Sequence, residues 1–230
     1  MPFLDDSGIK PEAQRGPLVA AFATLLDQIE RLIVVNIMWA VQVLPGLIAL
    51  GVPELPMAIR WLLLFYTGFA LAPATGTLFG VALSVCQGQH LSPALAYEHL
   101  RSLLMPSLRA LAPIYGLFGL LGWAIMGVDM FHLLALAVLF RLTLLLLLLC
   151  SMYWGPLFAA DPAQSAGRIL RRSIQLGWRE PYLTLLTFGV VVVALLIGTI
   201  SIGGLFLVVP VLVALLQTRL YQATTLEGDA

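Results

Sequence analysis

Long apolar blocks separated by short polar gaps run from residue 32 to residue 220 of this chain. Several blocks reach or exceed the roughly 20 residues with which an α-helix crosses the hydrocarbon core of a bilayer. Because 60% of the residues are hydrophobic and 10% are charged, the chain is too apolar for a soluble domain of this length. The pattern predicts an all-α fold, a polytopic transmembrane helical bundle of about six spans.

The basic residues fall in alternate gaps between the blocks. Lys10, Arg15 and Arg31 precede the first block, further arginines crowd the gap after the fourth block, and Arg219 follows the last one. Lys and Arg in short loops mark the cytoplasmic side of a membrane protein. We therefore expect both termini in the cytoplasm. The formal net charge is zero and the arginines lie at the ends of predicted spans, which argues against a nucleic-acid partner.

The same pattern divides the chain into three regions. Residues 1–28 form a polar N-terminus with an amphipathic interfacial helix, 29–220 the transmembrane domain, and 221–230 a polar C-terminal tail. Between residues 182 and 220 there is room for two short spans that fold back at Ser201–Gly204. A single long span is the alternative, but it would leave Arg219 on the outer side.

Two further amphipathic helices are expected on the cytoplasmic side. Ser92-Pro93 and Asp161-Pro162 each combine an N-cap residue with a proline at the first helical position. The second of these helices has a basic face of three arginines, Arg168, Arg171 and Arg172, which suits anionic lipid or a protein partner. Asp129 is expected to cap the fourth span in the same way.

Arg141 is the one charged residue well inside a predicted span, and such a residue is a functional hypothesis by default. No acidic residue lies inside a predicted span, so its partners should be neutral. Asn36, Gln42 and the carbonyls freed at Pro45 and Pro73 are the candidates. In the functional interpretation, the Arg141 guanidinium would contact an anion or a polar solute inside the bundle. The alternatives are a hydrogen-bonded strut between helices and a side chain that snorkels to the outer interface.

Small residues recur every fourth position of the second span, at Gly68, Ala72, Gly76 and Gly80. Such a ridge lets another helix approach closely. An internal packing face is the preferred interpretation, and a homodimer seam or a groove for substrate is the alternative.

Catalytic and metal-binding motifs were sought and not found. The histidines and carboxylates do not cluster at a spacing that would hold zinc. We expect no enzyme activity, no metal and no cofactor.

Three motifs resemble a known family. They are Asn36 and Trp39 in VNIMWAVQVLP, Pro73-Ala74-Thr75 in APATGTLFGVAL followed by a turn at Gly88, and the stretch YWGPLFAAD. Their order resembles the YesL-like family of bacterial integral membrane proteins of unknown function. The resemblance implies the bacterial inner membrane and an accessory or regulatory role near a carbohydrate-uptake system. Its partners would be the lipid bilayer and a transporter subunit or a second copy. The residues themselves leave an alternative, a small-solute transporter or channel that uses Arg141.

Overall fold

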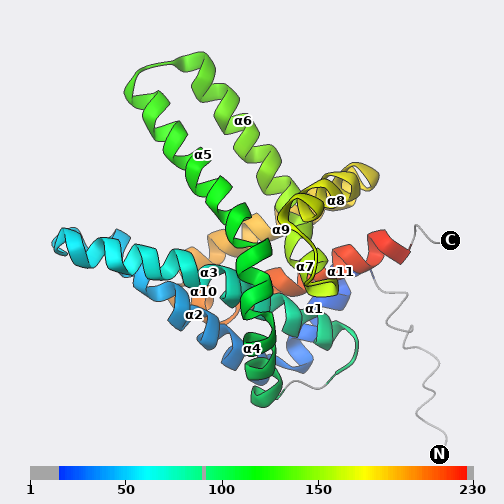
Figure 1. Cartoon of the computed structure of the whole chain (residues 1–230). Coiled ribbons are helices and arrows are strands. Elements are labelled where there is room, and N and C mark those ends of the chain that lie inside the picture. The colour runs from blue at the N-terminus through cyan, green and yellow to red at the C-terminus, as the bar shows by residue number, and fades with distance from the viewer. Residues whose placement is uncertain (1–15, 90–91, 227–230) are drawn as a thin grey trace, which may run out of the picture.

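The computed structural model describes residues 16–89 and 92–226, which are helical without any strand. Figure 1 shows the arrangement of the elements. Their bounds are α1 (Pro17–Asp27), α2 (Ile29–Gly51), α3 (Met57–Cys86), α4 (Pro93–Ala110), α5 (Ala112–Met130), α6 (Leu134–Cys150), a short 3-10 turn η3 (Ser151–Tyr153), α7 (Trp154–Ala160), α8 (Ala166–Arg179), α9 (Pro181–Ile200), α10 (Ile202–Leu207) and α11 (Val209–Leu226).

Five helical segments in the described part of the chain are long and apolar enough to cross a membrane. They are α2, α3, α5, the stretch from Leu134 to Ala160 that includes α6 and α7, and α9. The predicted all-α membrane bundle is thereby confirmed, but the predicted number of about six spans exceeds this count by one. The difference is α11, which packs against α1, α3, α7 and α9. These helices enclose α11, so its surface faces protein. Its polar side chains Gln217, Thr218 and Thr224 are therefore buried inside the bundle.

The end of the chain folds back as a hairpin. Helix α9 ends at Ile200, the Ser201 hydroxyl accepts a hydrogen bond from the Gly204 N–H at 3.3 Å, and α11 returns beside α9. The prediction of a turn at this place, in preference to one long span, is correct. Helix α11 continues to Leu226, so residues 221–226 are not the polar tail that the sequence indicated. Residues 227–230 of that tail, like residues 1–15, lie outside the described residues.

Helix α1 packs on α11 through small residues. Ala20, Ala21, Thr24 and Leu25 are buried, whereas Phe22 is 42% exposed. Small side chains bring two helix backbones close together, so α1 belongs to the bundle and does more than lie in the interface.

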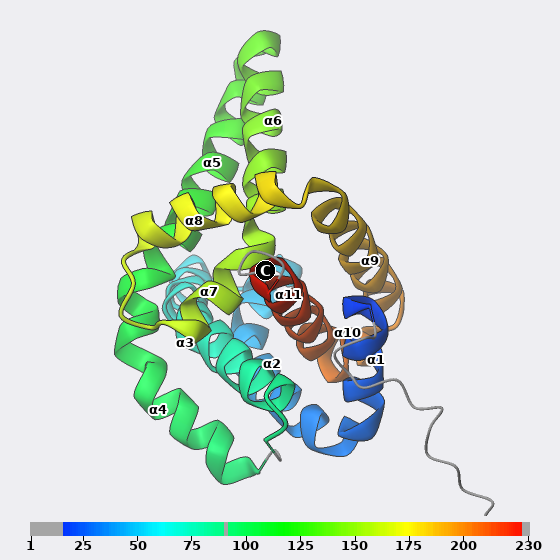
Figure 2. The same cartoon turned by 90° about the vertical axis from the view of Figure 1, so that its right-hand side faces the viewer.

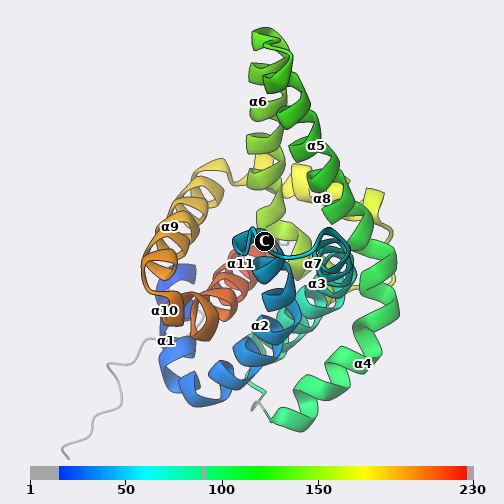
Figure 3. The same ribbon diagram turned by 90° about the vertical axis from the view of Figure 1, so that its left-hand side faces the viewer.

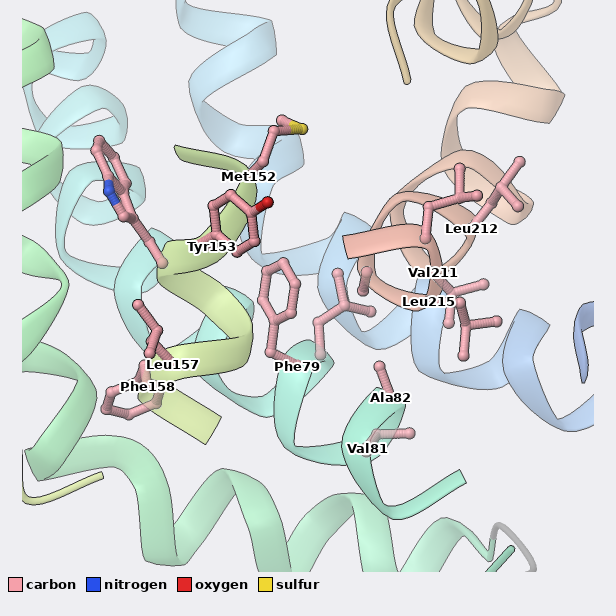
Figure 4. Close-up of a cluster of buried hydrophobic side chains, with 14 of the residues drawn as sticks. Phe79, Val81, Ala82, Met152, Tyr153, Leu157, Phe158, Val211, Leu212 and Leu215 are labelled. Atoms are coloured by element: carbon pink, nitrogen blue, oxygen red, sulfur yellow. The ribbon is translucent and has the colours of Figure 1, made fainter. Parts of the chain in front are cut away.

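The core lies where α3, η3, α7 and α11 meet (Figure 4). Phe79 of α3, Tyr153 of η3, Phe158 of α7 and Leu215 of α11 are buried there. Close packing at this junction depends on Gly155, because a Cβ at that position would overlap the ring of Phe79.

The small-residue ridge of α3 is only partly used for packing. A Cβ at Gly76 would lie 2.9 Å from the Phe158 ring, and one at Gly80 would lie 2.8 Å from Leu103 of α4. Ala72 is fully buried, but a Cβ at Gly68 would meet open space. The ridge therefore contacts α4 and α7 along its second half, and the predicted packing face does not extend to Gly68.

Of the predicted helix caps, one is present and two are absent. The Ser92 hydroxyl accepts a hydrogen bond from the Leu95 N–H at 3.2 Å, and Pro93 is the first residue of α4, as predicted. Helix α8 begins only at Ala166, because the Asp161 carboxylate accepts from the Ala163 N–H at 3.2 Å in a turn. Asp129 lies in the last turn of α5 and does not cap α6. Asp side chains stabilise turns as readily as caps, which explains the error at Asp161.

Two features stand out in the views from either side (Figures 2 and 3). The α5–α6 hairpin rises away from the rest of the bundle, and α8 lies across the bundle near the base of that hairpin. Helix α8 and the C-terminal end of α11 share one side of the molecule, while the turn between α2 and α3 lies on the opposite side (Figure 1).

Candidate functional site

Arg141 forms an ion pair with Asp129 across the α5–α6 hairpin. One guanidinium nitrogen, Nη2, donates to both carboxylate oxygens at 2.7 and 2.8 Å. The two side chains are 52% and 45% exposed, so the pair lies on the surface near the hairpin tip. The prediction of neutral partners in the bundle is therefore wrong, because the acidic residue that was assigned to a cap lies inside α5.

The turn between these helices explains the pairing. His132 has a φ of 55°, in the left-handed region that few residues other than glycine adopt. This conformation reverses the chain between α5 and α6, so residues twelve positions apart become neighbours across the hairpin. The periodicity of a single span gives no information about such a contact, which is why the sequence did not reveal it.

Asn36 joins α2 to the junction of α10 and α11. Its side-chain amide is fully buried, with Nδ2 donating to the Leu207 carbonyl at 2.7 Å and Oδ1 accepting from the Val211 N–H at 2.9 Å. Leu207 and Val211 are four residues apart and would be partners in an unbroken helix. The Asn36 amide thus replaces one helical hydrogen bond at the break, which makes it a structural link between helices.

Gln42 and Pro73 do not join Asn36 or Arg141 in a polar site. The Gln42 amide donates to the Met38 carbonyl of its own helix at 3.0 Å. Pro73 is buried in α3, and its carbonyl accepts from the Thr77 hydroxyl at 2.8 Å. The four residues proposed from the sequence thus lie at separate places, each with its own local partners.

The bundle instead contains an apolar central cavity of about 410 Å³. Five aromatic residues contribute to its wall, namely Trp39, Phe79, Tyr115, Phe118 and Trp154. The rings of Phe118 and Trp154 meet edge to face with centroids 5.1 Å apart. Further lining residues come from α3, η3, α9 and α11, and among the described residues at its wall none is charged. Such a cavity accommodates the apolar part of a lipid or small molecule and disfavours an ion, which would lose its hydration.

The sequence motifs that resemble the YesL-like family converge on this cavity. Trp39 comes from the first motif, Thr75 from the second, and Trp154 and Gly155 from the third, and all four line the cavity. The cavity is not among the sites that the sequence predicted. Its wall is assembled from residues of separate helices, which only the fold brings together.

The predicted basic face of α8 is on the surface. Arg168, Arg171 and Arg172 are all exposed, while Ile169 and Ser173 of the same helix are buried against the bundle. Within residues 16–89 and 92–226 no carboxylate forms an ion pair with these arginines. Their charge is therefore available to an external anion.

A half-buried histidine links α4 to α3. The His99 Nε2 atom lies 3.1 Å from the Ser84 hydroxyl, and burial lowers the pKa of His99, an effect that neighbouring Glu98 opposes. The described residues contain no group of three His, Cys, Asp or Glu side chains that could hold a metal ion.

Comparisons with protein family models, with curated proteins and with solved structures found no match for this chain.

Proposed function

We propose that this chain is a non-enzymatic, multi-pass protein of the bacterial inner membrane that acts by packing its α5–α6 hairpin against another integral membrane protein. Both termini would lie in the cytoplasm, in keeping with the Lys and Arg distribution. The proposed association with carbohydrate uptake rests on the YesL-like motifs. The observation that supports a partner is the exposure of the hairpin.

Burial is distributed very unevenly over the membrane-spanning helices. In the most apolar stretch of α3, 72% of residues are buried inside the chain, against 6% for α5 and 6% for the stretch that begins with α6. The hairpin helices contact each other and leave most of their remaining surface unpacked. Helix association in membranes depends on close packing, which the hairpin lacks within this chain.

One face of α5 has the composition of a helix–helix interface. Gly116, Gly119, Leu120, Trp123 and Gly127 lie within an arc of about 100° of an ideal helix; we call them the α5 glycine face. A Cβ at any of its three glycines would meet nothing within 4 Å. Glycine weakens a helix by roughly 0.5–1 kcal/mol relative to alanine in water. Because these glycines make no close contact inside the chain, a helix of a partner is the natural explanation for them.

The transporter alternative has less support. It requires Arg141 beside a path through the bundle, whereas this side chain pairs with Asp129 near the hairpin tip, away from the apolar central cavity. Replacement of Arg141 by alanine is then expected to leave solute uptake into reconstituted vesicles at the level of the unaltered protein.

The partner proposal can be tested by photo-crosslinking in native membranes. A photoreactive amino acid at Leu120, which is 64% exposed on α5, should yield one discrete protein adduct. The same amino acid at Leu196, which is 61% exposed on α9, should crosslink to lipid only. Equal adducts from both helices would contradict a specific interface, and an adduct of twice the chain's own mass would indicate a homo-oligomer in place of an accessory role.

A matched pair of variants separates loss of the interface from loss of the fold. Gly119→Leu fills open space on the α5 glycine face, while Gly189→Leu fills open space on α9. A Cβ at either position meets nothing within 4 Å, so both variants should fold. Only Gly119→Leu should abolish the Leu120 adduct, and persistence of the adduct in that variant would refute the assignment of the α5 glycine face.

A further inference from the structure

Helix α8 presents an arc of positive charge along one side. Arg168, Arg171, Arg172 and Arg179 fall within about 100° of an ideal helix. All four are exposed. The helix contains no acidic residue, so nothing within α8 offsets this charge. An anion that approaches this face meets several guanidinium groups at once, and these bind phosphate oxygens in a two-pronged geometry.

An apolar groove of about 200 Å³ lies against the same helix. Its floor is formed by α6 and α9, including Leu146, Leu149 and Leu185, and its edge by residues of α8. Cys150, the last residue of α6, and Pro181, the first residue of α9, also line it. The groove is therefore located where α6 ends and the membrane-spanning helix α9 begins, and the start of a span meets the headgroup region.

The positive charge of α8 lies beside the groove along the same stripe of the helix. Ile174 and Trp178 line the groove and are 47% and 81% exposed. Arg171 precedes them by three and seven residues, so the three side chains follow one stripe of the helix. A guanidinium thus lies about one turn along the helix from the apolar lining. Tryptophan at such a position is typical of membrane interfaces, where its ring is apolar and its N–H is polar.

We propose that this α8 groove binds one anionic phospholipid, with the phosphate on Arg171 and its neighbouring arginines and an acyl chain between α6 and α9. This site is independent of the proposed partner interface on α5. The combination of features favours a lipid over an acidic protein segment. An acidic segment would need the arginines alone, whereas a lipid also accounts for an apolar groove between two membrane-spanning helices beside them.

Lipid retention by the full-length protein tests the proposal. The protein is reconstituted with equal amounts of phosphatidylglycerol and phosphatidylcholine, extracted in mild detergent and examined by native mass spectrometry. The unaltered chain should retain one phosphatidylglycerol. Arg171→Gln should reduce retention about fivefold, the effect of one basic residue at an anionic surface, while Arg101→Gln on the exposed face of α4 should leave it unchanged.

Filling the groove provides the second arm. Gly177 lines the groove and a Cβ there meets nothing within 4 Å, so Gly177→Leu should fold while it excludes the acyl chain. Gly189→Leu on α9, also in open space, is the control. Added phosphatidylglycerol should also slow alkylation of Cys150 by N-ethylmaleimide in delipidated protein, and Gly177→Leu should remove that protection.

Three results would overturn the proposal. Equal losses in the Arg171 and Arg101 variants would mean that the lipid is held by diffuse attraction only. Retention that survives Gly177→Leu would show that the groove holds no acyl chain. A protein adduct from a photoreactive amino acid at Trp178, with phosphatidylglycerol retention unaffected by Arg171→Gln, would assign the face to an acidic protein partner instead.

Discussion

The hydrogen bonds of Asn36 offer the most direct test of how this bundle is held together. Asn36→Leu retains the branched shape of the side chain but removes both the donor and the acceptor. The Leu207 carbonyl and the Val211 N–H would then lose their partners at the break between α10 and α11. Because Asn36 is fully buried, water cannot replace the amide without repacking of the site.

A lower and an upper limit can be set for the free energy of unfolding that Asn36→Leu loses. Interhelical hydrogen bonds in membrane bundles average about 0.6 kcal/mol each, which gives about 1 kcal/mol for two. An unsatisfied buried group costs about 1–3 kcal/mol, which gives up to about 6 kcal/mol. Direct pairing of the Val211 N–H with the Leu207 carbonyl would recover part of that penalty. We therefore expect a loss of about 2–3 kcal/mol in the free energy of unfolding.

The assay is unfolding of the purified protein by SDS in mixed micelles, followed by tryptophan fluorescence. Gln42→Leu is the matched control, because that amide is only half-buried and bonds to a carbonyl of its own helix. The control should lose less than about 0.5 kcal/mol, as expected for a substitution away from buried polar contacts. If Asn36→Leu and Gln42→Leu lost the same stability, Asn36 would not be the link between α2 and the helix break.

Three further predictions concern other contacts of the bundle. An exposed ion pair contributes about 0–1 kcal/mol, so Asp129→Asn and Arg141→Leu should each cost less than about 1 kcal/mol in the same titration, and a larger loss would mean that the pair is shielded from water. Gly155→Ala places a methyl group against the Phe79 ring and should cost about 1–3 kcal/mol through overpacking, measured as a lower Tm; an unchanged Tm would show that the ring moves freely. Since burial lowers the pKa of His99, the unfolded chain takes up a proton at higher pH than the folded one. The contribution of the neutral His99 to the free energy of unfolding is complete above about pH 6.5 and is lost as the pH falls through the lower pKa of the folded state. The Tm should therefore drop on acidification in the unaltered protein and stay level in His99→Gln.

Features that depend on neighbouring residues in the sequence were predictable. Ser92 before Pro93 marked the start of α4, and Ser201 marked the end of α9, because a cap or a turn is determined by a few consecutive residues. The overall class followed from hydropathy, since every backbone polar group in a bilayer must be satisfied and helices do this locally. Asn36 was predicted as a partner of Arg141, and its bonds to the Leu207 carbonyl and the Val211 N–H were not predicted.

Features that depend on contacts between distant residues were not predictable. Asp129 looked like a cap because it precedes an apolar block, and only the fold of the hairpin brings it to Arg141. The polar side chain of Gln217 lowered the hydropathy of α11, yet the other helices surround α11 and bury that residue. The central cavity was missed for the same reason, because its wall comes from several helices whose neighbours the sequence pattern does not specify.

Because burial is uneven, the contacts that stabilise the fold lie around α11, away from the exposed α5–α6 hairpin. Around α11 several polar side chains have partners within the bundle. The Tyr153 and Thr184 hydroxyls lie 2.6 Å apart, and Arg219 donates to the Thr24 hydroxyl at 3.1 Å. In the α5–α6 hairpin, by contrast, only 6% of the residues in the most apolar stretch of each span are buried, and the Asp129–Arg141 ion pair is exposed. Changes on the α5 glycine face should therefore alter association and leave the unfolding of the isolated protein unchanged, whereas changes at Asn36 should do the reverse. Because the two kinds of change have opposite signatures, lost association without lost stability can be assigned to an external contact of the hairpin.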